Sequence, residues 1–296
     1  MDARNFKIAL FGNVYQEKKS FAVQKIFAVA NQLGFDMAVE EGFYTFLRDS
    51  VQIDIPDCEI IVGNDFVANI AICMGGDGTF LDVASRIGHK EIPILGINTG
   101  RLGFLANFSP KDIESILTDI YNGKYNVEKH SVIRMTCDEM PLDGFPFALN
   151  EIAILKHDIS AMISIHTSID GEYLTTYQAD GLIIGTPTGS TAYSLSVGGP
   201  IIVPHLDTIS LTPVAPHSLN MRPIVLSDKS TIDLCVESRS GNFLVSFDGR
   251  SQGYPDHIHL HILKAPYCVK VITRQKNSFY STLRTKMMWG ADMRKN

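Results

Sequence analysis

Hydrophobic and polar positions in the first 129 residues alternate between two patterns. Short apolar runs, which predict buried strands, occupy residues 6–11, 70–74 and 93–98. Stretches with apolar residues at helical spacing occupy 18–33, 79–87 and 111–121, the last with Ser109 as its cap and Pro110 in its first turn. Strands that alternate with helices predict a parallel sheet, which binds ligands at the carboxyl ends of its strands.

Beyond residue 129 the pattern changes to short runs that are typical of strands. They cover residues 132–137, 148–155, 162–169, 182–185, 209–213, 231–237, 243–247 and 257–263. Asp170-Gly171 is a hairpin signal between two strands, and a single helix is expected here, beginning at Ser190 or Thr191. A strand at 268–272 and a helix around 279–288 return to the first pattern. We therefore expect an α/β domain made of residues 1–129 and 267–296, and a β-rich, sandwich-like domain made of residues 130–266.

The composition is that of an ordinary globular protein of about two domains, with 296 residues, 45% of them hydrophobic. The formal net charge of −6 and the absence of a basic block argue against nucleic acid as a partner. Five dispersed cysteines without a C-x-x-C pair are typical of a reducing cytoplasm and argue against a disulfide framework or a cysteine zinc site. No apolar run is long enough to predict a signal peptide or a membrane span.

The four residues Gly75-Gly76-Asp77-Gly78 stand between a predicted buried strand and a predicted helix. Glycines allow backbone N–H groups to approach an anion, and the helix N-terminus attracts negative charge, so this corner is suited to phosphate. A carboxylate there repels phosphate unless it activates a hydroxyl or holds a metal beside the phosphate chain. The alternative is a tight turn with Asp77 near a cap position, and the tetrapeptide alone does not decide between the two.

The β-rich part contains a second polar cluster, residues 180–200, in which an apolar strand is followed by small and hydroxyl residues. Hydroxyls and free N–H groups in a Gly/Pro-shaped loop are suited to ribose, amide or phosphate oxygens, and Tyr193 offers a ring for stacking. A surface loop rich in Ser and Thr is the alternative. Nearby, Asn150-Glu151 interrupts an apolar strand, so both side chains need partners from a ligand or from a neighbouring loop.

Taken together, these segments resemble the NAD kinase family. The resembling residues are Gly75 to Thr79, Asn98 to Phe104, Asn150-Glu151, Asp180-Gly181, Thr186 to Tyr193, Pro216-His217, Arg222-Pro223 and Asp248-Gly249. The glycine-aspartate motif alone is shared with related lipid and sugar kinases. The run Thr-Pro-Thr-Gly-Ser-Thr-Ala-Tyr with Asn-Glu upstream is much more specific to NAD kinases.

The resemblance implies a Rossmann-like α/β domain that the C-terminal tail completes, a β-rich domain, and ATP-dependent phosphorylation of the 2′-hydroxyl of the adenosine ribose of NAD. It also implies a divalent cation such as Mg²⁺, and a homo-oligomer, either a dimer or a tetramer. ATP, or another phosphoryl donor, and NAD would be the substrates. Two alternatives stay open: a related lipid or sugar kinase, and a non-catalytic NAD(P)-binding regulator.

The resemblance also implies roles for individual residues. Asp77 would be the general base and the catalytic residue, and the neighbouring glycines would form the phosphate loop. Asn150 and Glu151 would hold the adenosine part of NAD, while Asp180 and Ala215 would lie toward the nicotinamide end. The residues expected to bind substrate are Gly75, Gly76, Asp77, Gly78, Phe104, Asn150, Glu151, Asp180, Thr188, Thr191, Ala192, Tyr193, Ser194, Leu195, Ser196 and Ala215. No metal ligand is assigned.

The chain departs from the family pattern at three positions. Arg250 stands where the family often has Gln, Gln178-Ala179 where many members have a basic residue, and Ala161 where His or Arg is frequent. Because of these departures, the sequence does not identify the cations that contact phosphate. Arg250 is a candidate to take their place. Separately, His257, His259 and His261 alternate, which predicts one face of a strand and either a metal site or a half-exposed surface.

Overall fold

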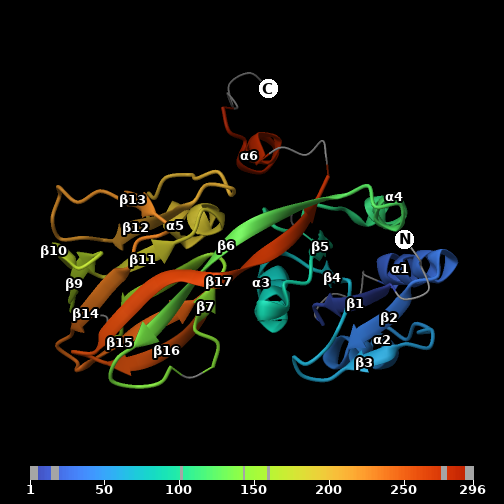
Figure 1. Cartoon of the computed structure of the whole chain (residues 1–296), viewed down its shortest axis with the longest axis horizontal. Coiled ribbons are helices and arrows are strands. Elements are labelled where there is room, and N and C mark those ends of the chain that lie inside the picture. Colours follow the sequence, from blue (N-terminus) through green and yellow to red (C-terminus); the bar gives the residue numbers. More distant parts are fainter. Residues whose placement is uncertain are drawn as a thin grey trace. The chain divides into compact units, whose positions relative to one another are not determined.

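The computed structural model describes residues 6–14, 20–100, 103–142, 144–158, 161–274 and 279–290. The chain divides into two compact units, one made of residues 1–129 and 269–296 and the other of residues 130–268. Figure 1 shows the elements of both in sequence colours. Within the described residues, no helix is both long and apolar enough for a membrane span.

The first unit is built on a parallel sheet. Its strands are β1 (Lys7–Gly12), β2 (Asp36–Glu40), β3 (Glu59–Ile61), β4 (Ile70–Met74) and β5 (Ile94–Ile97), in the order β5-β4-β1-β2-β3. The last strand of the chain, β17 (His259–Thr273), joins beside β5 in parallel. From β1 the chain moves to β2 and β3 on one side and then to β4 on the other. The carboxyl ends of β1 and β4 therefore form a topological switch point, where α/β sheets bind ligands.

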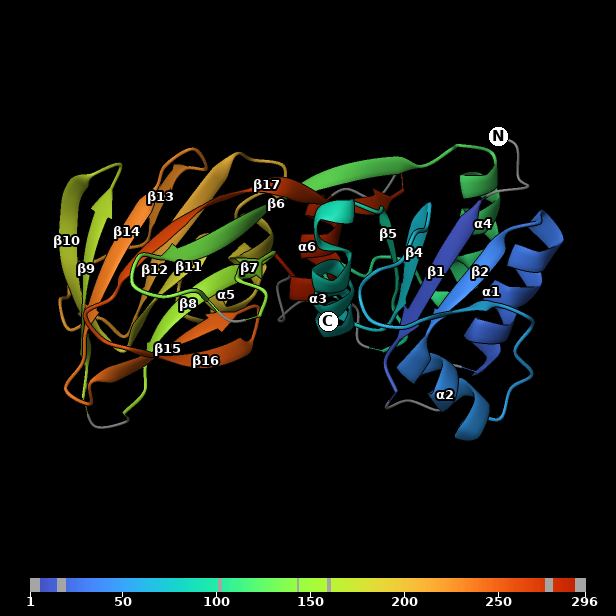
Figure 2. The ribbon, with the colours of Figure 1, turned by 60° about the horizontal axis from the view of Figure 1, so that its bottom comes forward.

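The described part of the first unit contains five helices, and Figure 2 shows most of them beside the sheet. They are α1 (Ser20–Leu33), α2 (Glu41–Asp49), α3 (Asp77–Ile87), α4 (Ile113–Tyr121) and α6 (Phe279–Met287), with short 3₁₀ turns at Gly88–Lys90 and Pro110–Asp112. Ile26 of α1 and Ile116 of α4 belong to the same hydrophobic core as the strands. The capping box of Ser109 and Asp112, with Pro110 in the first turn, begins the α4 region as the sequence predicts.

The second unit is a β-sandwich. One sheet has the antiparallel order β13-β12-β11-β8-β15-β16; in the other, β10, β9, β14 and β17 are neighbours, with β6 beside β17 and β7 beside β6. The bounds are β6 (Asn126–Cys137), β7 (Phe147–Ala148), β8 (Glu151–Lys156), β9 (Ile163–Ile169), β10 (Glu172–Ala179), β11 (Gly181–Gly185), β12 (Thr208–Val214), β13 (Ile224–Ser227), β14 (Ile232–Glu237), β15 (Asn242–Phe247) and β16 (Arg250–Pro255). Ile154 and Ile184 of the first sheet share one core with Ile165 and Leu260 of the second. A 3₁₀ turn (Thr188–Thr191) and the short helix α5 (Tyr193–Ser196) follow β11.

The structure corrects the sequence predictions at several elements. Residues 148–155 form two strands, not one, because the N–H groups of Leu149, Asn150 and Glu151 donate to the Asp248 side chain at the break. The two strands expected at 257–263 and 268–272 are the single strand β17, and His257 lies in the turn before it, with φ of 59°. The strands β2, β3, β10, β13 and β16 and the helix α2 were not among the predicted elements. Residues 18 and 19 of the first expected helix lie outside the described residues.

Candidate functional site

The glycine corner lies at the carboxyl end of β4, a strand whose five residues are all buried. The Gly75 N–H donates to the Ile97 carbonyl oxygen at 3.0 Å, and α3 begins at Asp77 after an extended Gly76. A Cβ on Gly75 would lie 2.3 Å from the Thr79 hydroxyl, so the tight turn requires glycine there. The first N–H groups of α3 have no partner within the helix, and such groups bind anions. The local sequence thus places the free N–H groups of a helix start at the carboxyl edge of the sheet.

Asp77 is the first residue of α3, and its carboxylate binds a neighbouring segment of the chain. Oδ2 accepts the Phe104 N–H at 2.6 Å, while Oδ1 accepts the N–H groups of Leu105 at 3.0 Å and Ala106 at 3.2 Å. A Cβ on Gly103 would lie 1.9 Å from Oδ1, so glycine is needed for this close approach. The carboxylate is therefore held in one orientation, and one of its four lone-pair directions stays available. Arg101 and Leu102, which precede this segment in the resembling motif, lie outside the described residues.

The helix α6 contacts the same segment from the C-terminal end of the chain. The ring of Phe279 lies 6.4 Å from the ring of Phe104, and the Lys286 ammonium lies 4.9 Å above the Phe104 ring. Burial lowers the pKa of Lys286 to about 8, although the negative charge of Asp77 acts to raise this pKa. The corner thus combines an acid, a partly desolvated cation and helix N–H groups within the first unit.

A hollow of about 230 Å³ lies at the switch point, lined by the end of β1 and one face of α3, with Asn13, Thr79 and Arg86 among its residues. Arg86 donates to Glu40 at 2.9 Å and to the Gly63 carbonyl oxygen at 2.8 Å. Burial raises the pKa of Glu40, but the hydrogen bonds from Arg86 and from the Phe43 N–H outweigh it and hold that pKa below its usual range. Arg86 therefore fixes the wall of the hollow.

In the second unit, Asp248 organises the start of β8. Its carboxylate accepts the N–H groups of Leu149 at 2.7 Å, Asn150 at 2.8 Å and Glu151 at 3.0 Å. Asp248 stands in the turn between β15 and β16 with φ of 49°, and Gly249 follows with φ of 85°. Burial raises the pKa of Asp248, and the three N–H groups oppose that effect. This Asp-Gly pair belongs to the resembling motifs, but no site role was expected for it.

Asn150 and Glu151 carry buried oxygens that lack partners. Both residues are 8% exposed, and among the described residues neither Asn150 Oδ1 nor Glu151 Oε2 has a hydrogen-bond partner. Burial, followed by the charge of Asp248, raises the pKa of Glu151 to about 8, while the Tyr193 N–H opposes the rise by donating to the carboxylate. Buried unsatisfied polar atoms are costly, so their presence in a folded protein indicates a ligand or water in contact with them.

The loop after β11 packs directly on Asn150. A Cβ on Gly189 would lie 2.1 Å from the Asn150 carbonyl oxygen, so only glycine allows this contact. The hydroxyls of Thr186, Ser190 and Ser194 bond to the protein itself, at 2.5 Å to the Leu149 carbonyl, 2.7 Å to the Pro187 carbonyl and 3.0 Å to the Thr212 hydroxyl. These hydroxyls shape the loop.

Other residues of the loop differ in how much of the side chain is accessible. The Thr188 hydroxyl lies 2.8 Å from His130 Nδ1, and both residues are buried. Tyr193 and Ser196 are exposed, while Thr191, Ala192 and Leu195 are partly exposed. The Tyr193 N–H donates to the Glu151 carboxylate, so the structure brings this part of the loop to Glu151.

Asp180 and Ala215 lie together at the opposite end of β11. The Asp180 N–H donates to the Val214 carbonyl oxygen at 3.0 Å, and its carboxylate forms an ion pair with Lys156 at 2.7 Å. Ala215 has φ of 44°, a strained value for a residue with a side chain. Gly181 pairs with Leu155 and Gly185 with Glu151, so the two groups of residues are separated by four residue steps along the strand, about 13 Å.

The three departures from the family pattern have different surroundings. Arg250 donates to the carbonyl oxygens of Phe247 at 3.1 Å, Phe147 at 2.9 Å and Phe145 at 3.4 Å, so much of its hydrogen-bonding capacity joins strands. Gln178 and Ala161 line a surface pocket of about 580 Å³ in the second unit.

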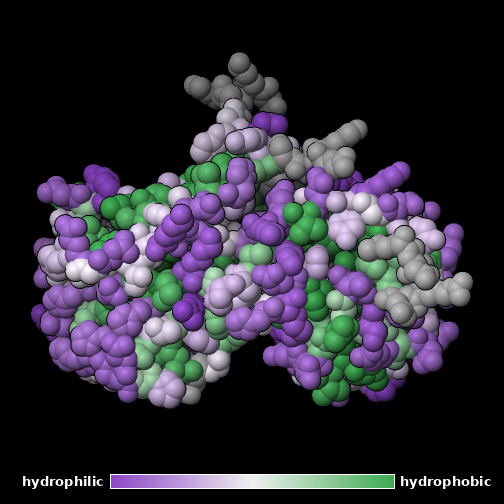
Figure 3. All heavy atoms as spheres, viewed as in Figure 1, coloured by the Kyte–Doolittle hydropathy of each residue, from purple (hydrophilic) through white to green (hydrophobic). Residues whose placement is uncertain are grey.

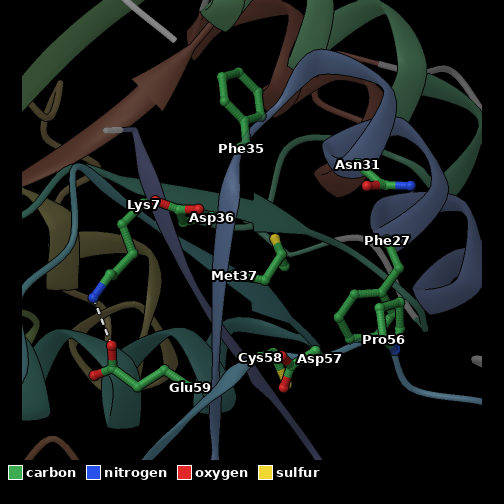
Figure 4. Close-up of a pocket in the computed structure, with 10 residues that line it drawn as sticks. All are labelled: Lys7, Phe27, Asn31, Phe35, Asp36, Met37, Pro56, Asp57, Cys58 and Glu59. Carbon is green, nitrogen blue, oxygen red and sulfur yellow. Dashed lines mark hydrogen bonds and ion pairs between the residues drawn. The ribbon is translucent and has the colours of Figure 1, made fainter. Parts of the chain in front are cut away.

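A further pocket, of about 570 Å³, lies at the amino ends of β1, β2 and β3, where Lys7 and Glu59 form an ion pair (Figure 4). Parallel sheets place their ligand sites at the carboxyl ends, so this pocket lies at the wrong edge for the chemistry of Asp77. The three alternating histidines likewise have carboxylates of their own: His257 with Asp256, His259 with Glu139, and His261 with Asp138 and Asp233.

No group of three or more His, Cys, Asp or Glu side chains within the described ranges lies close enough to hold a metal ion. The chain thus presents no prebuilt cage for a metal in the part that the structure describes. The residues to which sequence reasoning assigned no site role are Gly103 and Lys286 in the first unit and His130 and Asp248 in the second. Only Asp248 carried a local signal, its turn-forming glycine, because the others act through contacts with residues far away in the chain.

Family models and related sequences of known proteins both match this chain to one family. The model of the ATP-NAD kinase N-terminal domain matches residues 8–125, and that of the ATP-NAD kinase C-terminal domain matches residues 149–273. An NAD kinase of Bacteroides fragilis is 55% identical over 288 residues, covering 97% of this chain and 99% of its own length. An NAD kinase of Porphyromonas gingivalis is 40% identical over 288 residues, with the same coverage.

Solved structures agree in fold. The crystal structure of an NAD kinase from Archaeoglobus fulgidus in complex with ATP has a TM-score of 0.74 and 26% identity, and covers 96% of this chain and 99% of its own. Yeast NADH kinase complexed with NADH has a TM-score of 0.89 over 100% of this chain and 91% of its own, at 21% identity. The two matching domain models and the closely similar full-length relatives leave one conclusion: the chain belongs to the NAD kinase family.

Proposed function

We propose that this protein phosphorylates NAD to NADP, transferring the γ-phosphoryl group of ATP to the 2′-hydroxyl of the adenosine ribose, with Asp77 as the general base. Relatives with 55% and 40% identity over nearly the full length are NAD kinases, and a structural relative holds ATP. The observation that carries the assignment of Asp77 is its position, because the carboxylate stands in a glycine corner at the start of α3, at the carboxyl edge of the sheet.

The proposed reaction depends on how the Asp77 carboxylate is positioned relative to the ribose hydroxyl and the phosphoryl group. A ribose hydroxyl is a weak nucleophile, and a fixed carboxylate can accept its proton as the new P–O bond forms. Three backbone N–H groups hold the Asp77 carboxylate in a single orientation, and Gly103 allows them to come close. The N–H groups at the start of α3 would bind the transferring phosphoryl group, so the cost of bringing the reactants together is met before the reaction.

The second unit supplies the groups proposed to bind NAD. The unpartnered oxygens of Asn150 and Glu151 would accept hydrogen bonds from the adenosine part, and the exposed ring of Tyr193 would stack on the adenine. Asp180 and Ala215 would lie toward the nicotinamide. Their separation from Glu151 along β11 supports an extended dinucleotide across this strand.

A divalent cation, Mg²⁺ in our proposal, would arrive with the polyphosphate of ATP. In kinase sites Mg²⁺ is bound through one or two carboxylates together with substrate phosphates, and it neutralises charge on the transferring group. Because the described residues contain no prebuilt donor cluster, we assign it no ligands from this chain.

We also propose a homo-oligomer, a dimer or a tetramer, in the cytoplasm. The strand β10 is at an edge of its sheet and exposes Tyr173 and Leu174, which supports pairing with a second copy. Figure 3 shows hydrophobic residues in groups between hydrophilic ones on one face of the molecule. The cysteines within the described residues are all free thiols, which supports a reducing compartment.

Incubation with ATP, Mg²⁺ and NAD tests the reaction, with NADP measured by an NADP-specific dehydrogenase. We expect NADP to accumulate and to depend on all three components. Parallel reactions with NADH as acceptor and with inorganic polyphosphate as donor define the substrate preferences. If NAD binds in calorimetry but no NADP forms with either donor, the protein is a binding module and the proposed reaction is wrong.

A further inference from the structure

Lys286 lies close to the proposed catalytic corner although it comes from the last helix of the chain. Phe279 and Lys286 are seven residues apart on α6, two helical turns, and both side chains contact the ring of Phe104. The Lys286 ammonium also donates to the Asn107 Oδ1 atom at 3.4 Å. The face of α6 that touches the 103–107 segment therefore presents one cation to it.

This cation differs from the other partly buried lysines. Lys7, Lys25, Lys156 and Lys270 each form an ion pair with a carboxylate, at 2.5, 3.3, 2.7 and 2.9 Å. Lys286 has no carboxylate partner among the described residues, only an aromatic ring and an amide oxygen. Taking an ammonium partly out of water without a counter-charge is costly, so the structure retains it at a cost to stability.

The same short segment connects Lys286 to Asp77. The Phe104 N–H donates to the Asp77 carboxylate, while the Phe104 ring lies under the Lys286 ammonium. Asp77 is also the acidic group whose charge acts on Lys286. The 103–107 segment contains no charged residue, and Arg284, the other cation of α6 in the described part of the chain, is exposed. In the part of the chain that the structure describes, Asp77 and Lys286 are thus two charged groups that contact this segment.

We propose that Lys286 is a further catalytic residue, whose ammonium binds the anionic oxygens of the transferring phosphoryl group at the glycine corner. The inference rests on the proposed kinase reaction and deepens it. Phosphoryl transfer is catalysed largely by cationic groups that lie against the negatively charged phosphoryl oxygens. Lysine acts there as a point charge. The phosphoryl group supplies the anion that Lys286 lacks within the protein.

Three variants separate this role from simple packing of α6. Lys286→Met keeps an unbranched apolar stem over Phe104 but removes the charge. Lys286→Arg keeps the charge, with a pKa too high to titrate near neutrality. Arg284→Met removes an exposed cation from the same helix and is the matched control.

The test is steady-state kinetics with ATP and NAD varied in turn, from about pH 6 to about pH 9.5. We expect Lys286→Met to lower kcat/KM for ATP on the order of 100-fold, with KM for NAD changed less than about threefold and Tm equal to or above that of wild type. Wild-type kcat/KM for ATP should fall as the pH rises past about 8, because Lys286 loses its proton. Lys286→Arg should retain activity within about tenfold and move that fall to higher pH, and Arg284→Met should match wild type.

Wild-type kinetics in Lys286→Met would overturn the role of Lys286. So would an equal loss in Lys286→Met and Lys286→Arg, because the charge would then be irrelevant. The two proposals fail in different ways: a wild-type protein that makes no NADP sinks the reaction itself, whereas an active Lys286→Met beside an inactive Asp77→Asn removes Lys286 alone.

Discussion

Two aspartates hold the backbone in the same manner, one in each unit. Asp77 accepts the N–H groups of three consecutive residues from Phe104, and Asp248 accepts those of three consecutive residues from Leu149. In both cases a side chain satisfies donors that a strand ladder would otherwise pair. Each aspartate thus fixes the segment that carries further proposed site residues, Phe104 in one unit and Asn150 with Glu151 in the other.

Replacement of Asp77 by Asn tests its two functions together. We expect turnover to fall by on the order of 10² to 10⁴-fold, because the amide cannot accept the ribose proton. Tm should also fall, since the amide NH₂ would face the N–H groups of residues 104–106. Kinetics, melting curves and NAD calorimetry measure the three quantities.

Gly103→Ala is the matched variant for Asp77. Its Cβ would lie 1.9 Å from Asp77 Oδ1, so it displaces the carboxylate without changing its chemistry. We expect it to lower kcat while NAD still binds. Near-normal turnover in Asp77→Asn would remove Asp77 from the proton transfer.

Glu151 should make stability depend on pH. Its pKa is raised from 4.5 to about 8 in the folded protein, so the folded state keeps a proton that the unfolded state loses above about pH 4.5. The stabilising effect of that proton is complete below pH 4.5 and is lost as the pH rises toward 8. Glu151→Gln lacks this titration, so its Tm should exceed that of wild type by roughly 5 °C or more at pH 8, and less at pH 5. Parallel Tm profiles for the two proteins between these pH values would contradict the raised pKa.

At the scale of elements, the loop from Thr188 to Ser196 contains both buried residues that fix its conformation and exposed residues that are proposed to bind NAD. Its buried hydroxyls fix the loop, while the Tyr193 side chain is 37% exposed and its N–H contacts Glu151. We expect Tyr193→Ala to weaken NAD binding about fivefold, through about 1 kcal/mol of lost stacking, with Tm nearly unchanged. Calorimetry with NAD and with ATP distinguishes the substrates. Unchanged NAD affinity combined with lost ATP binding would reverse the proposed placement of the two ligands.

The strand β17 is connected to β14 by a charged pair as well as by its ladder. Hydrogen bonds to Asp233 and Asp138 raise the pKa of His261 above 6.5. The resulting stabilisation is complete below the unfolded pKa and is lost as the pH rises through the folded one. His261→Asn should therefore melt below wild type at pH 5.5, by about 2 °C, and the difference should shrink at pH 9. A difference that grows with pH would exclude the pairing.

Element prediction succeeded where the signal is local and failed where it is not. The strand β4, the capped start of the α4 region and the Asp170-Gly171 turn, with φ of 53° and 82°, match their sequence signals. The strand β17 continues through residues 264–267, where a break between two strands was expected, although it contains Pro266 and proline is unusual inside strands. The break between β7 and β8 is caused by Asp248, which lies 97 to 99 residues away in the chain.

At the scale of the molecule, the sequence was sufficient for the fold class, because strand–helix alternation and closely spaced short strands are visible without tertiary information. The candidate site was found as motifs, and its residues stay predictions, as do the expected domain boundaries. Gly103 belongs to the resembling motif Asn98 to Phe104, but its contact with Asp77, and the places of His130 and Lys286, could not be found that way, because each acts on a residue between 26 and 182 positions away. Their residue types carry no signal of their own.

The first unit is interrupted in the chain by the whole of the second, and this has a consequence for synthesis on the ribosome. Val271 pairs with Ile94, and Phe279 and Lys286 contact Phe104, so these partners leave the ribosome only after the intervening residues 130–268. At 5 to 20 residues per second, the delay is roughly ten to thirty seconds. During that interval the nascent first unit carries an uncovered strand edge at β5 and an uncovered Phe104 ring. The part of the protein that begins first is therefore the last to be completed.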